Sequence, residues 1–168
     1  MKALVPSLIG ALALTACAAT PPATTAQTAP AAAPAAPVQT TIAAKDVQWG
    51  PAPPVFAPGA QMAVLHGDPS KAETFVLRLK FPKGFHVAPH RHPGAEIVTV
   101  ISGTYRIGVG DVADPKKAKP LPAGGFWAYS PGTAMWGYAD TETVLQLNAV
   151  GPLGFTYVNP AHHPQHNK

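Results

Sequence analysis

The stretch GFHVAPHRHPGAEIVTVISG, residues 84–103, begins and ends with glycine and places His90, His92 and the acid Glu96 close together in sequence. In a β-strand, residues two apart point to the same face, so His90 and His92 are expected on one side of a strand. The proline and glycine that follow break this strand, and Glu96 opens the next one, Glu96–Ser102, which is rich in Ile and Val. Two imidazoles and a carboxylate gathered in this way are a ligand set for a first-row divalent metal ion.

The chain on both sides of this stretch indicates an all-β domain. Thr74–Phe81 alternates apolar and polar residues, which is typical of a half-buried strand, and no stretch of ten or more residues between 42 and 168 shows a helical period. Short strands separated by turns rich in Gly and Pro predict a sandwich or barrel. The further strands expected are Gln61–His66, Tyr105–Val109, Phe126–Tyr129, Met135–Tyr138 and Thr143–Val150, and Asp114–Pro122 is expected to be a loop.

The fixed positions of the same stretch resemble the first conserved motif of the cupin superfamily, Gly84-x5-His90-x-His92-x3-Glu96-x6-Gly103. In cupins, these two histidines and the glutamate line the mouth of a small β-barrel and bind a divalent metal ion. The resemblance, which covers roughly residues 61 to 160, is to small bacterial single-domain cupins. It implies a cupin-type β-barrel (a jelly roll) after a disordered N-terminal tether. It also implies that His90, His92 and Glu96 hold Fe, Mn, Zn or Ni, with Cu as a further alternative.

The second cupin motif is similar to Gly125-x5-Pro131-Gly132-x2-Met135, but the family's fourth ligand is a histidine where this chain has Met135. Three interpretations stay open. The ion is held by the other three ligands, with an open coordination position. Alternatively, the Met135 thioether is the fourth ligand, which suits copper. In the third, Met135 fills an apolar gap, and the barrel holds an organic ligand or nothing. His86 and Tyr138 lie near this position, and we expect them to be wall residues rather than ligands.

The resemblance does not specify a reaction, because one fold hosts many functions. The first hypothesis is a binding barrel that takes a divalent metal ion, an unknown small organic ligand, or both, in its mouth. The alternative is a metal-dependent enzyme of the dioxygenase or isomerase type that uses the open coordination position. A third is a structural envelope protein in which the barrel forms a homodimer. The aromatic residues that could wall a pocket are Phe85, Tyr105, Phe126, Trp127 and Trp136.

The N-terminal part reads as a targeting segment and a tether. Residues 1–16 carry a lysine and then a short apolar run, which is typical of a secretory signal peptide. The only cysteine, Cys17, ends the run LTAC, which resembles a bacterial lipobox. The resemblance implies lipid on Cys17, cleavage before it, and a membrane anchor at the periplasmic face of the outer membrane. Residues 17–41, rich in Ala, Pro and Thr, are expected to be a disordered linker, which leaves 42–168 as the cupin domain.

The charge distribution and the C-terminal histidines limit the classes of binding partner that we expect. The net charge is +4, and the positive residues are scattered except for three lysines within residues 116–119, in an expected loop. Without a basic helix or an aromatic stacking platform, we expect no nucleic-acid partner. His162, His163 and His166 lie near the end of the chain, where they could bind metal adventitiously or close over the barrel mouth, and we expect the former.

Overall fold

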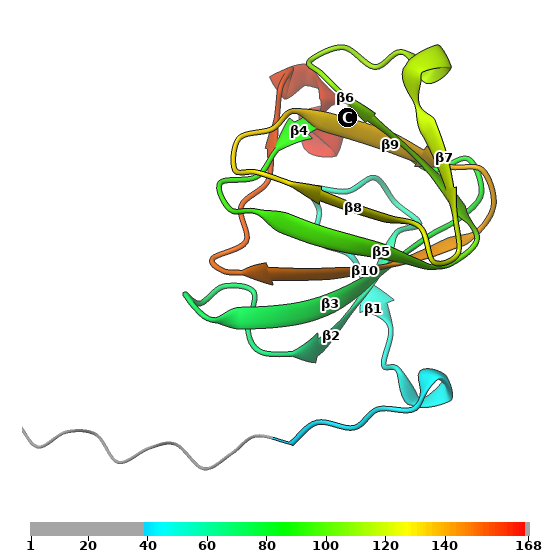
Figure 1. Ribbon diagram of the computed structural model, residues 1–168. Helices are drawn as coiled ribbons and strands as arrows, with labels where there is room; N and C mark the ends of the chain where they lie inside the picture. The colour runs from blue at the N-terminus through cyan, green and yellow to red at the C-terminus, as the bar shows by residue number, and fades with distance from the viewer. Residues whose placement is uncertain (1–38, 167–168) are drawn as a thin grey trace, which may run out of the picture. The chain divides into compact units, whose positions relative to one another are not determined.

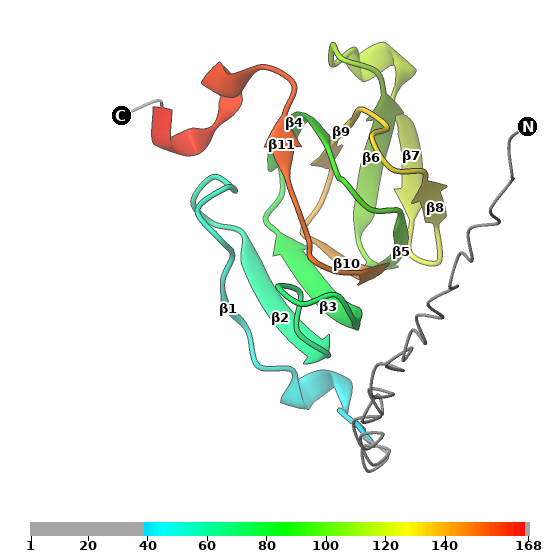
Figure 2. The same ribbon diagram turned by 90° about the vertical axis from the view of Figure 1, so that its left-hand side faces the viewer.

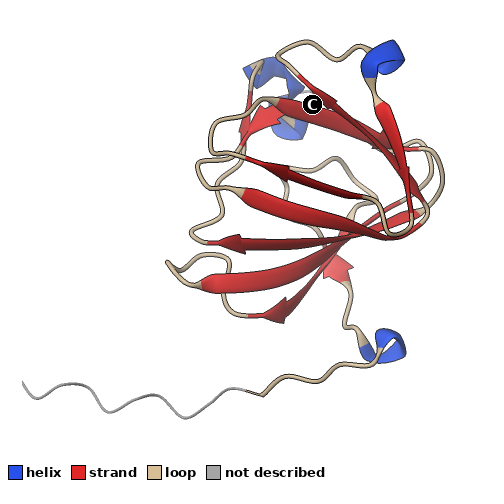
Figure 3. Ribbon diagram, in the orientation of Figure 1, coloured by secondary structure: helices blue, strands red, loops and turns tan. Residues whose placement is uncertain are grey.

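The computed structural model describes residues 39–166, which fold into two antiparallel sheets that face each other (Figures 1 and 3). These residues belong to one compact unit, Val38–Lys168. Within them, no helix is long and apolar enough to cross a membrane. The expected signal peptide, Cys17 and most of the expected linker lie outside the described residues.

The larger sheet has the strand order β1-β2-β3-β10-β5-β8, and the smaller has β11-β4-β9-β6-β7. The strands of the larger sheet are β1 (Gly50–Pro51), β2 (Gln61–His66), β3 (Thr74–Phe81), β5 (Glu96–Ser102), β8 (Phe126–Tyr129) and β10 (Thr143–Val150). Those of the smaller sheet are β4 (His86–Arg91), β6 (Thr104–Val109), β7 (Lys119–Pro122), β9 (Met135–Ala139) and β11 (Thr156–Tyr157). Short 3-10 turns occur at η1 (Ala44–Asp46), η2 (Pro115–Lys117), η3 (Pro160–His162) and η4 (Pro164–His166).

The core fills the space between the sheets, as the alternating patterns predict. In β3 every second side chain is buried, and the buried set is Phe75, Leu77, Leu79 and Phe81. In the same sheet, β5 and β10 contribute Val98, Val100, Leu145 and Leu147, and from the facing sheet β6 contributes Tyr105 and Ile107. Full burial of a large apolar side chain contributes about 1.5–3 kcal/mol, so this layer supplies much of the driving force for closing the barrel. The prediction of an all-β jelly roll is confirmed.

The prediction of a loop between β6 and β8 was wrong in part. Asp114–Pro122 contains the 3-10 turn η2 and the strand β7, which pairs with β6 alone. Prolines are tolerated there because β7 is the last strand of its sheet, where one side of the backbone needs no ladder hydrogen bonds.

The C-terminal segment crosses from one sheet to the other. It leaves β10 in the larger sheet, and its short strand β11 pairs with β4 in the smaller sheet. Figure 2 shows this segment running up from β10 to lie beside β4. We call residues 151–157 the strap, since they cover the end of the barrel where the two histidines of β4 and the following turn lie.

Candidate metal centre

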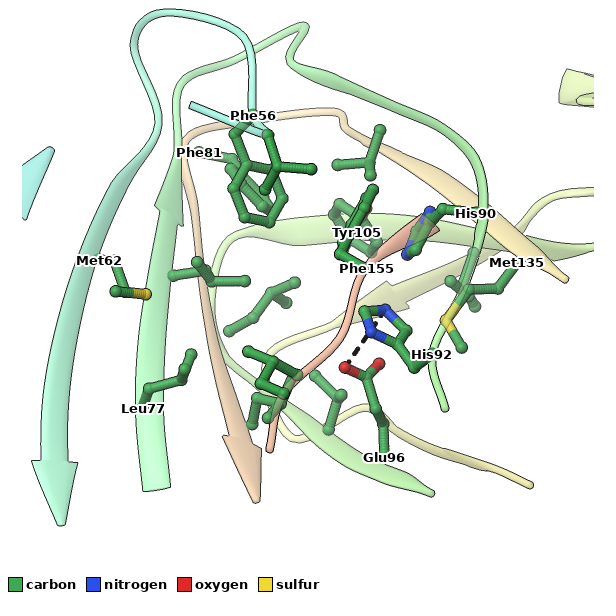
Figure 4. Close-up of a pocket in the computed structure, with 18 of the residues that line it drawn as sticks. Phe56, Met62, Leu77, Phe81, His90, His92, Glu96, Tyr105, Met135 and Phe155 are labelled. Atoms are coloured by element: carbon green, nitrogen blue, oxygen red, sulfur yellow. Dashed lines mark ion pairs between the residues drawn. The ribbon is translucent and has the colours of Figure 1, made fainter. Parts of the chain in front are cut away.

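His90, His92 and Glu96 lie together inside the barrel (Figure 4). They are 6, 7 and 4% exposed, respectively, although all three are polar. The ring centroids of His90 and His92 are 4.9 Å apart, and His92 Nε2 lies 3.3 Å from Glu96 Oε1. Buried polar groups of this kind are costly unless they are paired or bind a ligand, so the cluster is a candidate site rather than packing.

A β-bulge in β4 turns His90 inward. Val87 pairs with Gly137 and His90 pairs with Met135, so three steps along β4 match two along β9. As a result Val87 and His90 are both buried, whereas His86 is exposed. Simple alternation would have placed His86 on the same face as His90; instead its ring stacks on Tyr138, with 5.2 Å between centroids. The expectation that His86 and Tyr138 are not ligands agrees with this position.

Backbone carbonyls fix the orientation of both imidazoles. The Nδ1 atom of His90 lies 2.8 Å from the carbonyl oxygen of Ala88, and that of His92 lies 2.6 Å from the carbonyl oxygen of Gly154. A carbonyl oxygen only accepts, so each Nδ1–H donates and each Nε2 keeps a free lone pair. A hydrogen bond from the second ring nitrogen to a carbonyl is the usual arrangement behind a metal-binding histidine.

Burial shifts the protonation of the three groups toward their neutral forms. It lowers the pKa of His90 to about 4 and also lowers that of His92, while it raises the pKa of Glu96 to about 7. Glu96 Oε1 is buried without a hydrogen-bond partner among the described residues, apart from its contact with His92 Nε2. A proton on Oε1 would point to that lone pair, and a divalent cation would replace the proton there.

The donor chemistry therefore fits a divalent ion, but the three side chains do not yet point to one common position. Within residues 39–166, no three His, Cys, Asp or Glu side chains are placed so that they could hold an ion as they stand. The rings of His90 and His92 are nearly perpendicular, at 88°, because His90 stacks face to face on Phe155.

Met135 lies where the second motif would place the fourth ligand. It pairs with His90 across β4 and β9, is 4% exposed, and lines the same cavity as the three candidate ligands. Its side chain also belongs to the hydrophobic core cluster.

An apolar cavity of about 190 Å³ opens beside the candidate ligands. Of the five aromatic residues expected to wall a pocket, Tyr105 and Trp127 line it. Phe126 is instead 57% exposed, and Phe85 and Trp136 are buried outside the lining. Besides the candidate ligands, the lining is formed by Pro53, Val55, Phe56, Met62, Leu77, Leu79, Phe81, Val87, Val98, Tyr105, Ile107, Trp127, Met135, Leu145, Leu147, Leu153 and Phe155.

The strap supplies contacts that the sequence patterns did not predict. Gly154 accepts from His92, Phe155 stacks on His90, and the Tyr157 hydroxyl donates to the carbonyl oxygen of Val55, at 2.8 Å. The strap therefore joins both imidazoles to the loop before β2. The tail of the chain resembled that of the family, but no periodicity marked Phe155 as a site residue.

The C-terminal histidines do not join the candidate ligands. His163 and His166 lie with 5.2 Å between ring centroids, near η4. The Nδ1 atom of His163 accepts from the backbone N–H of Gln165, which leaves its proton on Nε2. A protonated nitrogen offers no lone pair, so this pair is poorly prepared to bind a metal ion.

A two-sheet antiparallel barrel with a His-x-His and a glutamate inside its mouth defines the chain as a cupin. Its sequence matches the model of the ChrR cupin-like domain over residues 37–153, and the chain therefore belongs to that family. A search of the curated proteins gives no match.

Solved structures show the same fold at low sequence identity. The polyketide cyclase RemF from Streptomyces resistomycificus is 13% identical, with a TM-score of 0.62 over 76% of this chain and 90% of that one. A putative acetylacetone dioxygenase from Methylibium petroleiphilum is 20% identical, with a TM-score of 0.57 over 74% and 85%. An RmlC-like cupin from Shewanella frigidimarina is 17% identical, with a TM-score of 0.53 over 67% and 91%. At these identities the likeness shows the fold alone.

Proposed function

We propose that this cupin binds a divalent metal ion through His90, His92 and Glu96, next to a small organic ligand in the barrel. The observation that carries the proposal is the set of free donor atoms in one buried corner. Among residues 39–166, both Nε2 atoms and Glu96 Oε1 have no hydrogen-bond partner apart from the contact between His92 Nε2 and Glu96 Oε1, whereas both Nδ1 atoms are already hydrogen-bonded. Fe, Mn, Zn or Ni suits two imidazoles and a carboxylate, and copper would be favoured only if Met135 also bound.

The chain's own residues would orient the site and keep it dry. The carbonyl oxygens of Ala88 and Gly154 hold the imidazoles, and Phe155 covers them from the strap. A bound ion would supply Lewis acidity toward a ligand oxygen. The apolar wall excludes water from the space where that ligand would lie.

The alternative is an enzyme, and the position of the cavity favours it. The cavity directly borders all three candidate ligands and Met135, so a substrate could reach an open coordination position. Solved structures of the same fold include an acetylacetone dioxygenase from Acinetobacter johnsonii and the polyketide cyclase RemF, so such barrels can support catalysis. Acid–base residues other than Glu96 are scarce around the cavity, and this favours the binding function.

We further propose that the protein is lipid-anchored at Cys17 in the cell envelope, at the periplasmic face of the outer membrane. The lipobox-like LTAC and the Ala/Pro/Thr-rich linker support this. A homodimer is a further proposal: Ile97, Ile101 and Phe126 are 47, 40 and 57% exposed on neighbouring strands β5 and β8. Radiolabelled palmitate incorporation with a Cys17→Ser control tests the anchor, and light scattering tests the dimer.

The metal proposal is tested by elemental analysis of protein purified without a histidine tag and with His162, His163 and His166 replaced by alanine. One ion per chain is expected, and the double variant His90→Ala/His92→Ala should lose it. If both proteins stay metal-free after reconstitution with Fe(II), Mn(II), Zn(II), Ni(II) and Cu(I), the metal proposal is wrong. Oxygen consumption with a substrate panel then separates enzyme from binding protein.

A further inference from the structure

We propose that the cavity takes one small, uncharged, mainly apolar molecule of about the size of a substituted benzene ring, and that Trp127 donates a hydrogen bond to its acceptor atom. This proposal gives the class of organic ligand for the site described above. It rests on the proposed function for the role of that ligand beside the metal. Four observations support it: the size of the cavity, its charge, its ring-rich wall and one unpaired donor.

The size of the cavity limits the ligand. Its volume is about 190 Å³, and an apolar cavity of roughly 150 Å³ in another protein takes up benzene. Roughly seven to ten non-hydrogen atoms would therefore fill the space. Sugars with more than one ring, nucleotides and fatty acids are too large to be enclosed.

The charge of the wall excludes anionic groups away from the metal ligands. None of the residues that line the cavity is lysine or arginine, and the ionisable ones are His90, His92, Glu96 and Tyr105. A phosphate or carboxylate in the apolar part would be buried without a cation, which is strongly unfavourable. The ligand is therefore neutral.

The aromatic wall favours a flat molecule. Phe56 and Phe155 meet edge to face, with 5.4 Å between centroids, and Phe56 also packs on Phe81, with 5.8 Å between centroids. All three rings line the cavity. An aromatic ligand can make offset or edge contacts with such rings.

Trp127 supplies the unpaired donor. Its side chain lines the cavity and is 8% exposed, and its indole Nε1 is buried without a hydrogen-bond partner among residues 39–166. An indole N–H only donates, so the missing partner must be an acceptor. Tyr105 holds the indole by stacking on it, with 5.6 Å between centroids and 14° between planes.

Gly137 makes room for this pair. A Cβ atom at Gly137 would lie 2.6 Å from Cε1 of Tyr105 and 2.7 Å from its Cζ, so any side chain there would displace the phenol ring. Trp136 offers a matched comparison. Its Nε1 is also buried and unpaired, but Trp136 does not line the cavity.

The experiment measures binding of three probes of equal non-hydrogen atom count by calorimetry, in metal-free full-length protein at pH 7.5. Acetophenone carries an acceptor, cumene carries none, and benzoate is charged. Acetophenone should bind about tenfold more tightly than cumene, as one hydrogen bond to a formerly unpaired donor allows. Benzoate should bind more weakly than either.

The variants assign the hydrogen bond to one residue. In Trp127→Phe the preference for acetophenone over cumene should disappear, and continued binding of cumene would show that the cavity still forms. Trp136→Phe should keep the tenfold preference. If Trp127→Phe does not fold, nitrogen-15 NMR of the wild type decides: acetophenone, but not cumene, should shift one indole N–H resonance that persists in Trp136→Phe and in Trp49→Phe.

Three results would overturn the proposal. Equal binding of acetophenone and cumene would exclude the donor, and tightest binding of benzoate would exclude the neutral class. Probe binding that survives in Leu147→Trp or Leu147→Phe, which fill the cavity, would place the ligand elsewhere. These measurements use metal-free protein, so they test the organic ligand independently of the metal. Failure of the ligand proposal would not contradict the metal proposal, and failure of the metal proposal would not contradict the ligand proposal.

Discussion

The ring of Phe155 lies almost parallel to the imidazole of His90, with 4.2 Å between centroids and 7° between planes. The same ring meets His92 edge to face, with 5.2 Å between centroids. One side chain from the strap therefore contacts both histidines of the motif, although it is distant from them in sequence. The orientation of the candidate ligands depends on the strap as much as on the strand that carries them.

Phe155→Ala should weaken metal binding by about tenfold, because residues behind metal ligands typically contribute 10- to 100-fold to affinity. The variant should also lose about 2 kcal/mol of unfolding free energy, less than for a fully buried phenylalanine, since Phe155 is half-buried. Zinc titration and urea denaturation measure the two effects. Phe126→Ala, on the exposed side of β8, is the control and should change neither. Unchanged zinc affinity in Phe155→Ala would show that the stack is only packing.

Gly154→Ala should lower metal affinity by about tenfold with only a modest loss of stability. A Cβ atom there would lie 2.7 Å from Cγ of Pro93, so either Pro93 or the backbone of Gly154 must move. Because Pro93 follows His92 and Gly154 accepts from it, we expect either movement to disturb the orientation of His92. Gly50→Ala in β1 is a matched control, because nothing lies within 4 Å of its new Cβ atom. Competition with a chelating dye measures both affinities. Equal affinities in the two variants would argue against a role for the Gly154 carbonyl.

Met135→His should raise zinc affinity by at least tenfold, since it adds an imidazole opposite His90 at the position that the family's second motif gives to a ligand. Met135→Leu keeps an apolar side chain of similar volume and should leave zinc affinity unchanged. Titrating the same two variants with Cu(I) separates the interpretations of Met135. Loss of Cu(I) binding in Met135→Leu would identify the thioether as a ligand, and unchanged binding would assign Met135 to packing.

The pH dependence of stability should contain a contribution from Glu96. Burial raises its pKa from 4.5 to about 7, so the folded state binds more protons than the unfolded state between these values. Its contribution is fully present below pH 4.5 and is lost as the pH rises through 7, by about 3 kcal/mol in total. The lowered pKa values of His90 and His92 act in the opposite direction, so total stability alone would hide the effect.

The measurable quantity is the difference in unfolding free energy between wild type and Glu96→Gln, in chelator, from pH 4 to pH 8. The histidine contributions largely cancel in this difference. As the pH rises, the wild type should lose unfolding free energy relative to Glu96→Gln. A difference that stays flat across this range would mean that folding does not shift the pKa of Glu96.

The fold could be predicted from sequence because the alternation of apolar and polar residues indicates which side chains of each strand are buried. Thr74–Phe81 and Thr143–Val150 carry period-two patterns, and both strands occur with the expected bounds. The presence of His90, His92 and Glu96 in one corner also follows from spacing and turn chemistry. The bulge in β4 does not, because an extra residue leaves no mark on composition, and it reverses the side to which His86 points.

The strap is the part of the site that sequence patterns could not predict. Its strand, Thr156–Tyr157, is too short to show a period, and its contacts with His90 and His92 are set by the path of the chain across the barrel end. The sequence indicated Trp127 as a possible wall residue of the pocket, but its role as a hydrogen-bond donor could not be predicted, for a similar reason. An aromatic residue in a strand indicates burial, and only the three-dimensional surroundings show whether its N–H has a partner.

The order in which the chain is made gives the strap a further consequence. His90, His92 and Glu96 leave the ribosome well before Gly154 and Phe155, so a growing chain holds the candidate ligands before it holds the groups that orient them. An oriented site exists only after the last long strand is in place and the strap has crossed to β4. If the proposed site takes a metal ion, the compartment in which folding finishes would determine which ions reach the completed site.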